Sequence, residues 1–256
     1  MNERETVLNE RGAVLNERGA VINKMGVVIN SMGAAVMWSD LKPGEIEKMS
    51  FDIIRRELEY ADRKGSAGTT KLLERETWVL WRVIHATADF EYAKNLLFLN
   101  NPCDAAIISL KQGAAIITDT NMALSGISKH MIERYGNIAL CLTSDESVTK
   151  KAAKLGVTRA AVAIEEAVSR YPSGIYVIGN SPTALLRLCE LIDEHKARPS
   201  LVVGCPVGFV NVIESKEAII KRNAPQIVTM GRKGGSNVAA AIMNAIMYGK
   251  EASGIG

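Results

Sequence analysis

The stretch that decides the fold class is residues 175–195, IYVIGNSPTALLRLCELIDEH. It opens with Ile175–Ile178, a run of β-branched and aromatic residues that is typical of a strand buried on both faces. A Gly-Asn-Ser turn follows, in which Asn180 or Ser181 can cap a helix over 182–195 that has proline in its first turn. The stretch therefore predicts a strand that leads through a tight turn directly into a helix.

The same alternation continues on both sides of this stretch. Strands are predicted at 114–118, 138–142, 175–178, 201–203 and 226–230. Helices are predicted at 46–58, 72–84, 146–155, 159–170, 182–195, 215–222 and 237–248. Such alternation is typical of a mainly parallel central sheet with helices on both faces, whose ligands bind in loops at the carboxyl ends of the strands. We therefore predict a single α/β domain over residues 42–256.

Residues 1–41 carry a seven-residue repeat in place of this pattern. Val-Leu-Asn or Val-Ile-Asn recurs in them, with one glycine in each repeat. Around a helix the contiguous apolar residues would spread over about 200° and would form no coiled-coil seam. Each glycine would also weaken a helix by about 1 kcal/mol. We predict a repetitive extension that is disordered or loosely helical, with Met25, Met32 and Met37 as alternative starts of the chain.

Composition argues against several functional classes. The formal net charge is only +3 and its charges are dispersed, so no nucleic-acid partner is expected. No apolar run approaches the roughly 18–20 residues of a membrane span, and no signal-type segment is present, so a soluble cytoplasmic protein is predicted. The four cysteines lie far apart and form no CxxC pair, so neither a disulfide nor a metal site is expected.

Loops after the predicted strands hold the most unusual residues. They are TDTNM at 118–122, GNSPT at 179–183, GCPVGF at 204–209 and GRKGGS at 231–236. Backbone N–H groups and cations at helix starts suit a carboxylate or a phosphate, although each loop alone is equally an ordinary turn. The absence of GxGxxG and GxxxxGK[ST] argues against a nucleotide-dependent enzyme. Four such loops at one sheet edge indicate a large anionic ligand.

Histidine is scarce, so candidates for acid–base chemistry are few. His130 and His195 lie in polar surroundings and are predicted to be solvent-exposed. His85 follows an apolar run, and the residues alone leave an even choice between a satisfied core histidine and a catalytic one. No GxSxG motif accompanies a serine, so no Ser-His-Asp triad is indicated.

Seven blocks of the sequence together resemble the precorrin-8X and cobalt-precorrin-8 methylmutases. They are MSFDII (49–54), RVIHATAD (82–89), TDTNM with GI (118–122, 126–127), GVTR (156–159), GNSPTAL (179–185), PVGFV (206–210) and GRKGGS (231–236). Each block is weak alone, but their number and order across residues 42–248 make the resemblance specific. The N-terminal repeat has no counterpart in the family.

This resemblance implies an isomerase of cobalamin biosynthesis that moves the C-11 methyl group of precorrin-8X or cobalt-precorrin-8 to C-12, which gives hydrogenobyrinate or cobyrinate. It implies a homodimer with corrinoid sites near the subunit interface. It also implies no redox or nucleotide cofactor, with cobalt present only as part of the substrate. Enzymes of neighbouring pathway steps are further candidate partners. Residues 85–89 and 118–127 resemble the cobalt-containing branch more closely.

Carried over by motif, His85 matches the family's catalytic histidine, which is expected over the macrocycle, where it protonates or hydrogen-bonds a ring nitrogen. A [1,5]-sigmatropic shift needs no nucleophile, so the protein must hold and polarise the ring. The residues expected to bind the substrate are Ser50, Thr118, Asp119, Arg159, Asn180, Ser181, Thr183, Gly208, Arg232, Lys233, Gly234 and Gly235. Among them, Ser50 and Arg159 align with ligand-proximal positions of the family.

Two positions depart from the family pattern. Ser181 stands where alanine is frequent, and Leu186 stands where phenylalanine is common. Both changes are mild and could retune the pocket without abolishing it. Two other hypotheses stay open at this point: a non-catalytic corrinoid carrier, and a nucleotide-dependent α/β enzyme.

Overall fold

The computed structural model describes residues 42–64 and 72–249, together with four short strands in the first forty-one residues. The chain divides into two compact units, residues 1–57 and 58–256, and the division falls inside helix α1 (Pro43–Arg63).

The described part of the N-terminal repeat consists of strands. They are β1 (Val14–Leu15), β2 (Val21–Ile22), β3 (Val27–Ile29) and β4 (Ala35–Met37). Each pairs antiparallel with the next, with Val28 opposite Val36 in the last pair. The β-branched residues of each repeat favour this pairing. The rest of the repeat, and with it the prediction of a disordered or loosely helical extension, lies outside the described residues.

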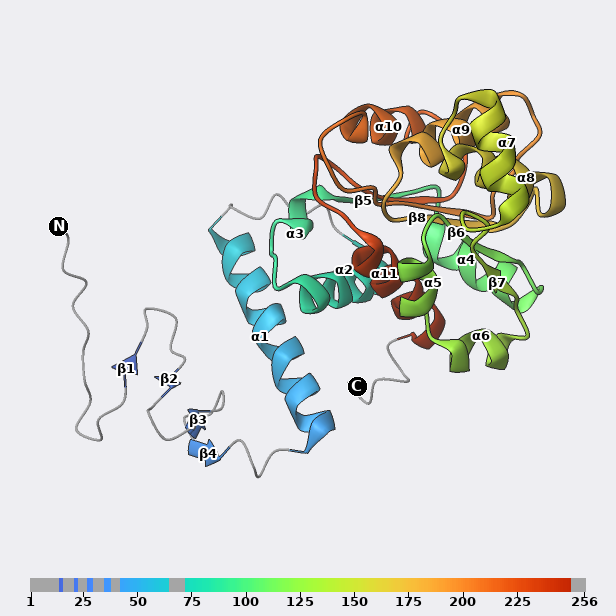
Figure 1. The fold of residues 1–256 in the computed structure, drawn as a ribbon. Helices are drawn as coiled ribbons and strands as arrows, with labels where there is room; N and C mark the ends of the chain where they lie inside the picture. Colours follow the sequence, from blue (N-terminus) through green and yellow to red (C-terminus); the bar gives the residue numbers. More distant parts are fainter. Residues whose placement is uncertain are drawn as a thin grey trace. The chain divides into compact units, whose positions relative to one another are not determined.

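A six-stranded sheet forms the centre of the second unit, in the order β5-β10-β9-β8-β6-β7 (Figure 1). The strands are β5 (Leu96–Leu99), β6 (Ile116–Thr118), β7 (Ala139–Leu140), β8 (Ile175–Ile178), β9 (Leu201–Gly204) and β10 (Gln226–Thr229). Every pair is parallel except β5 with β10. All residues of β8, β9 and β10 are buried, which explains why these strands are mainly apolar; the polar Gln226 and Thr229 at the two ends of β10 are buried as well.

Helices cover both faces of this sheet. They are α2 (Glu74–Thr87), α3 (Tyr92–Asn95), α4 (Pro102–Lys111), α5 (Asn121–Gly126), α6 (Lys129–Tyr135), α7 (Glu146–Leu155), α8 (Arg159–Arg170), α9 (Pro182–Asp193), α10 (Val212–Ile219) and α11 (Ser236–Tyr248). One layer contains α7, α8, α9 and α10, and the opposite layer contains α2, α4, α5 and α11 (Figure 1). The predicted α/β class, with a mainly parallel sheet between two helical layers, is confirmed.

Several elements differ from the prediction. Strand β5 and helices α3, α4, α5 and α6 were not predicted, and α10 lies three residues earlier than the predicted helix over 215–222. β5 was not expected, because a short run of leucine and phenylalanine does not distinguish a strand from a buried helix by periodicity. Only its antiparallel pairing with β10 makes it a strand. Helix α2 was predicted to end at residue 84 but continues to Thr87, so that His85 is a helical residue.

Candidate active site

The site is built at the carboxyl edge of the sheet. Because β6, β8, β9 and β10 run parallel, the loops that follow them emerge at the same edge. These loops are residues 118–122, 179–183, 204–209 and 231–236, the same four that the sequence marks as unusual.

Asp119 organises two of the four loops. Its carboxylate accepts backbone N–H bonds from Gly179 at 2.9 Å, Asn180 at 2.8 Å and Ser181 at 2.6 Å. The residue is only 2% exposed. Burial raises the pKa of its carboxyl group, while the three N–H donors oppose that rise. Asp119 therefore fixes the β8–α9 turn from inside, and its predicted contact with the substrate stays a prediction.

Threonine hydroxyls continue this internal network. The Thr118 hydroxyl is buried and donates to the Thr120 carbonyl at 3.0 Å. Thr120 shares a hydrogen bond with Ser236 at 2.8 Å and caps α5 by accepting the Ala123 N–H. The end of β6 is thus joined to the start of α11, and Thr118 acts within the protein interior.

The loops after β9 and β10 interlock through their backbones. The Gly235 N–H donates to the Cys205 carbonyl at 2.9 Å, and the Gly208 N–H donates to the Arg232 carbonyl at 3.3 Å. A Cβ atom at Gly234 would lie 2.2 Å from the Cys205 carbonyl oxygen, so only glycine permits this approach. The three glycines predicted to bind substrate therefore build the loop pair, and the N–H groups of Gly208 and Gly235 are already used.

Two helix N-termini meet at the same edge. Thr158 caps α8 and Ser181 caps α9, and Thr183 hydrogen-bonds both hydroxyls, at 2.7 Å to Thr158 and 3.0 Å to Ser181. Arg159 directly follows the α8 cap and is exposed, as is Asn180 next to the α9 cap. Two positive helix dipole ends beside a guanidinium suit an anionic group. Four predicted binding residues, Arg159, Asn180, Ser181 and Thr183, are thereby brought together.

His85 lies in the last turn of α2 and its side chain is exposed, so it is not a core histidine. The helix ends at Ala88, whose φ of 52° reverses the chain. Just beyond, Lys233 pairs with Asp89 at 2.5 Å and with Glu91 at 2.8 Å. The helix end that carries His85 is therefore tied to the β10–α11 loop at the sheet edge.

The two cations of that loop have different surroundings. Hydrogen bonds to Asp89 and Glu91 raise the pKa of Lys233 and balance its charge. Arg232 is exposed and lies over the ring of Phe209, 5.7 Å from its centroid. Arg232 thus remains available to an external anion, whereas Lys233 holds the loop to the His85 segment.

One buried cation at the site, Lys216, was not identified from the sequence. Lys216 on α10 has no exposed surface, and its Nζ donates to the carbonyls of Gly231 and Lys233 at 2.8 Å each. Burial lowers the pKa of Lys216 to about 8. In the sequence it reads as an ordinary polar residue of an amphipathic helix, so no local signal identifies it.

Ser50 belongs to the first unit. Its hydroxyl donates to the Ile46 carbonyl at 2.9 Å within α1. Its predicted place beside the ligand is therefore left as a prediction.

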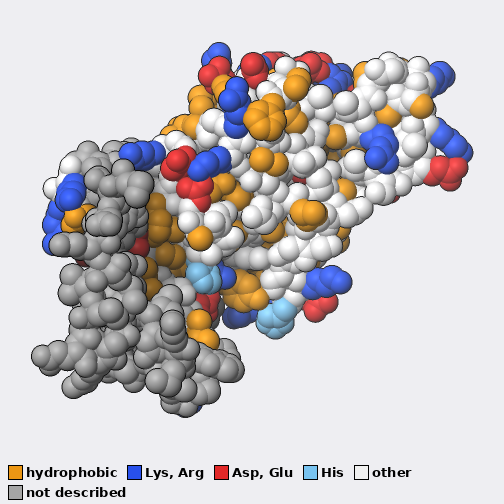
Figure 2. All heavy atoms as spheres, turned by 60° about the vertical axis from the view of Figure 1, so that its left-hand side comes forward, with side chains coloured by type: hydrophobic (Ala, Val, Ile, Leu, Met, Phe, Trp, Pro, Cys, Tyr) orange, Lys and Arg blue, Asp and Glu red, His pale blue; other side chains and the backbone are white. Residues whose placement is uncertain are grey.

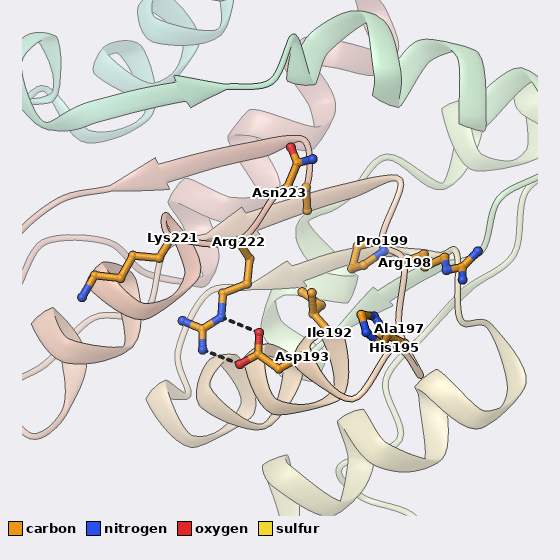
Figure 3. A pocket seen from close by; sticks show the side chains of 10 residues that line it. Ile192, Asp193, His195, Ala197, Arg198, Pro199, Lys221, Arg222 and Asn223 are labelled. Carbon is orange, nitrogen blue, oxygen red and sulfur yellow. Dashed lines mark hydrogen bonds and ion pairs between the residues drawn. The ribbon is translucent and has the colours of Figure 1, made fainter.

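A separate cavity of about 610 Å³ lies near the residues that precede β9 and β10, away from the strand-end loops (Figure 3). Its walls include His195, Arg198 and Lys221, and Arg222 pairs with Asp193 at 2.6 Å within it. His195 is exposed, as predicted. The position at the amino ends of the strands separates this cavity from the loops described above.

Within residues 42–64 and 72–249, no cluster of three or more His, Cys, Asp or Glu side chains is placed to hold a metal ion. None of the described helices has the length and apolar character needed to cross a membrane. On the face shown in Figure 2, cationic and anionic side chains lie in small mixed groups. That distribution differs from the single-sign field of a nucleic-acid interface.

Comparison with known proteins gives consistent matches. The family model described as Precorrin-8X methylmutase matches residues 45–249. Cobalt-precorrin-8 methylmutase of Priestia megaterium is 39% identical over 206 residues, which are 80% of this chain and 88% of that protein. The enzyme of the same name from Methanocaldococcus jannaschii is 45% identical over 174 residues, which are 68% of this chain and 80% of that protein. A crystal structure of precorrin-8X methylmutase from Thermus thermophilus superposes with a TM-score of 0.69 at 36% identity, over 79% of this chain and 95% of that one.

Proposed function

The chain belongs to the precorrin-8X methylmutase family, and on that premise we propose that its strand-end site binds a corrin precursor and that His85 assists the methyl shift. It is an isomerase of cobalamin biosynthesis, which moves the C-11 methyl group of precorrin-8X or cobalt-precorrin-8 to C-12. The observation that carries the proposal is the link between the His85 helix end and the loop of Arg232, made by Lys233 with Asp89.

In this shift one carbon–carbon bond at C-11 breaks as another forms at C-12, and the conjugated system rearranges. No nucleophile or external methyl carrier takes part. The protein must hold the ring, exclude water and stabilise the shifted electron distribution. We propose that the His85 imidazole does the last of these by sharing a proton with a ring nitrogen, since an imidazole can both donate and accept a hydrogen bond.

Carboxylates on the rim of the corrin ring account for the cations and helix ends. We propose that Arg159 and Arg232 bind them directly, with Asn180, Ser181 and Thr183 supplying hydrogen bonds at the α9 N-terminus. Ser50 is retained as a contact proposed from its place in the family motif.

Other residues in the predicted binding set support the site indirectly. The buried Thr118 and Asp119, together with the three loop glycines, shape the turns that present these groups. Lys233 joins two parts of the site. We propose that the main role of these six residues is to shape the site, and that they do not bind the corrin carboxylates as their main role.

We propose cobalt-precorrin-8 as the preferred substrate. Six relatives named for the cobalt-containing compound are 37–45% identical to this chain, whereas the precorrin-8X methylmutases of Pseudomonas aeruginosa and a Sinorhizobium species are 37% and 32% identical. In this proposal the cobalt belongs to the substrate and the enzyme uses no cofactor of its own.

A homodimer in the cytoplasm, in contact with enzymes of neighbouring steps, completes the proposal. The homodimer is supported by the apolar pair Phe209 and Val210, which are 84% and 78% exposed at the carboxyl edge of the sheet. Side chains of this kind at a site edge suit either a partner subunit or the macrocycle.

The function is tested by incubating the purified full-length chain with metal-free or cobalt-containing substrate. We expect a change of chromophore without a change of mass, because the reaction is an isomerisation, and faster conversion of the cobalt form. Binding of both compounds without conversion would support the carrier hypothesis, which the named relatives do not favour. Stabilisation by nucleotides but not by corrinoids would instead support a nucleotide-dependent enzyme.

A further inference from the structure

Among the residues that the structure describes, Lys216 is a buried cation with no carboxylate partner. It has no exposed surface, and no ion pair joins it to an acidic side chain of the described residues. Its ammonium bonds to the carbonyl oxygens of Gly231 and Lys233, and the ionisable group that acts on it is the Cys205 thiol. Burying a lysine in this way is costly, and an apolar side chain of the same length would fill the space without that cost.

The two carbonyls that Lys216 holds are those on either side of Arg232. Both bonds are 2.8 Å long, so one ammonium group fixes the backbone before and after this arginine. Gly231, with φ of 71°, provides the turn that directs its carbonyl inward. The Lys233 carbonyl receives a second bond, from the Thr229 hydroxyl at 3.0 Å.

With both carbonyls held inside, the side chains of the loop are left outside. Arg232 is exposed above Phe209, and the Lys233 ammonium reaches Asp89 beyond the His85 helix end. We propose that Lys216 is a positioning residue, which together with Thr229 tethers residues 231–233 so that Arg232 faces the substrate and Lys233 holds the His85 segment. The inference rests on the proposed function for what the loop binds, but the tether itself is a property of the ligand-free protein.

Lys216 does not act on the substrate directly. A side chain with no exposed surface cannot reach a corrin ring at the sheet edge, and its ammonium already donates to two protein acceptors. Its removal should therefore change how the loop is held and how substrate binds, more than the chemical step itself.

The test compares Lys216→Met with Lys221→Met, which changes an exposed lysine just after the same helix. Hydrogen–deuterium exchange of the ligand-free proteins reports on the loop. For Lys216→Met we expect amides of residues 231–235 to exchange about tenfold faster, the effect of losing one or two hydrogen bonds, while amides of β8 and β9 are unchanged. With the corrin substrate, KM should rise about tenfold and kcat should change much less. Lys221→Met should behave as wild type.

The tether would be overturned if the loop amides of Lys216→Met exchanged at the wild-type rate. A tenfold fall of kcat with unchanged KM would overturn it as well. Failure of the wild type to convert substrate would count against the proposed function, while the exchange result would still decide the tether. If Lys216→Met does not fold, Thr229→Val removes the other donor to the Lys233 carbonyl. Thr229→Val should accelerate amide exchange less than Lys216→Met and in the same loop only. Unchanged exchange in Thr229→Val would also contradict the tether.

Discussion

Asp119 shows what a single buried side chain contributes to this site. Three backbone N–H groups converge on one carboxylate, which is almost completely removed from solvent. Such bonds to a carboxylate are stronger than bonds between neutral groups, and they compensate for part of the cost of burial. The turn that starts α9 is therefore held by a residue from another strand, sixty positions earlier.

Replacing Asp119 by asparagine is expected to destabilise the protein by about 2–4 kcal/mol, because an amide N–H₂ would face backbone donors in a buried position. Chemical denaturation at neutral pH measures this loss. Asp145→Asn is the control, since Asp145 precedes α7 without a side-chain capping bond. Equal stability of the two variants would show that the buried carboxylate does not hold the turn.

Lys216 predicts a pH dependence of stability. Its pKa is about 8 in the folded protein, against an ordinary value of 10.5. Between these values the unfolded lysine keeps its proton while the folded one has lost it, so the unfolding free energy contributed by this residue rises with pH. Relative to Lys216→Met, wild type should gain about 2–3 kcal/mol between pH 7.5 and pH 10. Denaturation curves at both pH values measure this, and a constant difference between the two proteins would contradict it.

Residue types at the site could be predicted more easily than residue roles. The glycines at 208, 234 and 235 and the carboxylate of Asp119 were expected to bind substrate. The structure shows that they also hold the loops together, and their contact with substrate stays a prediction. Sequence shows that a loop can bind an anion and does not show which N–H groups are already used by another loop. Lys216 was missed for a related reason, since its acceptors lie on a loop 15 and 17 residues away.

At the scale of elements, the interlocked loops after β9 and β10 depend on backbone proximity. Gly234→Ala should force the Cys205 carbonyl away and cost about 2 kcal/mol or more of stability, with weakened substrate binding. Gly44→Ala is the control, because a Cβ atom there meets nothing within 4 Å. Thermal unfolding and substrate titration of both variants test this, and unchanged binding by Gly234→Ala would show that the loop pair is not part of the site.

The paired N-termini of α8 and α9 predict a separable binding effect. Removing the guanidinium with Arg159→Met should raise KM about tenfold or more and leave kcat nearly unchanged, since the interaction is with a rim carboxylate. Arg170→Met alters the far end of the same helix and should leave both constants as in wild type. Steady-state kinetics separates the two, and a loss confined to kcat would place Arg159 at the reacting centre instead.

Elements with strong local signals were predicted to the residue. β8 and the helices α7 and α8 have the expected bounds, because caps and apolar runs define them locally. β5 and the last turn of α2 were not predicted. The first depends on pairing with β10, and the second on a left-handed Ala88 that no sequence rule requires.

At the scale of the whole molecule, the order of seven sequence blocks carried the functional conclusion, and the matched family confirms it. Proposed dimerisation is tested by light scattering on the purified chain, which should give about twice the 27.7 kDa of one chain. Val210→Glu should shift the mass toward one chain, because it puts a charge into the exposed apolar pair. A monomeric wild type would contradict the dimer and assign this surface to the macrocycle or to another partner.

The central claim is that His85 assists the methyl shift, and conversion of cobalt-precorrin-8 by His85→Ala tests it most directly. His130→Ala, which alters another exposed histidine, is the matched control. We expect His85→Ala to bind the substrate with nearly wild-type affinity but to convert it about 100-fold or more slowly, as expected for loss of a proton-sharing group, while His130→Ala converts it at the wild-type rate. Conversion by His85→Ala at the wild-type rate would contradict the account.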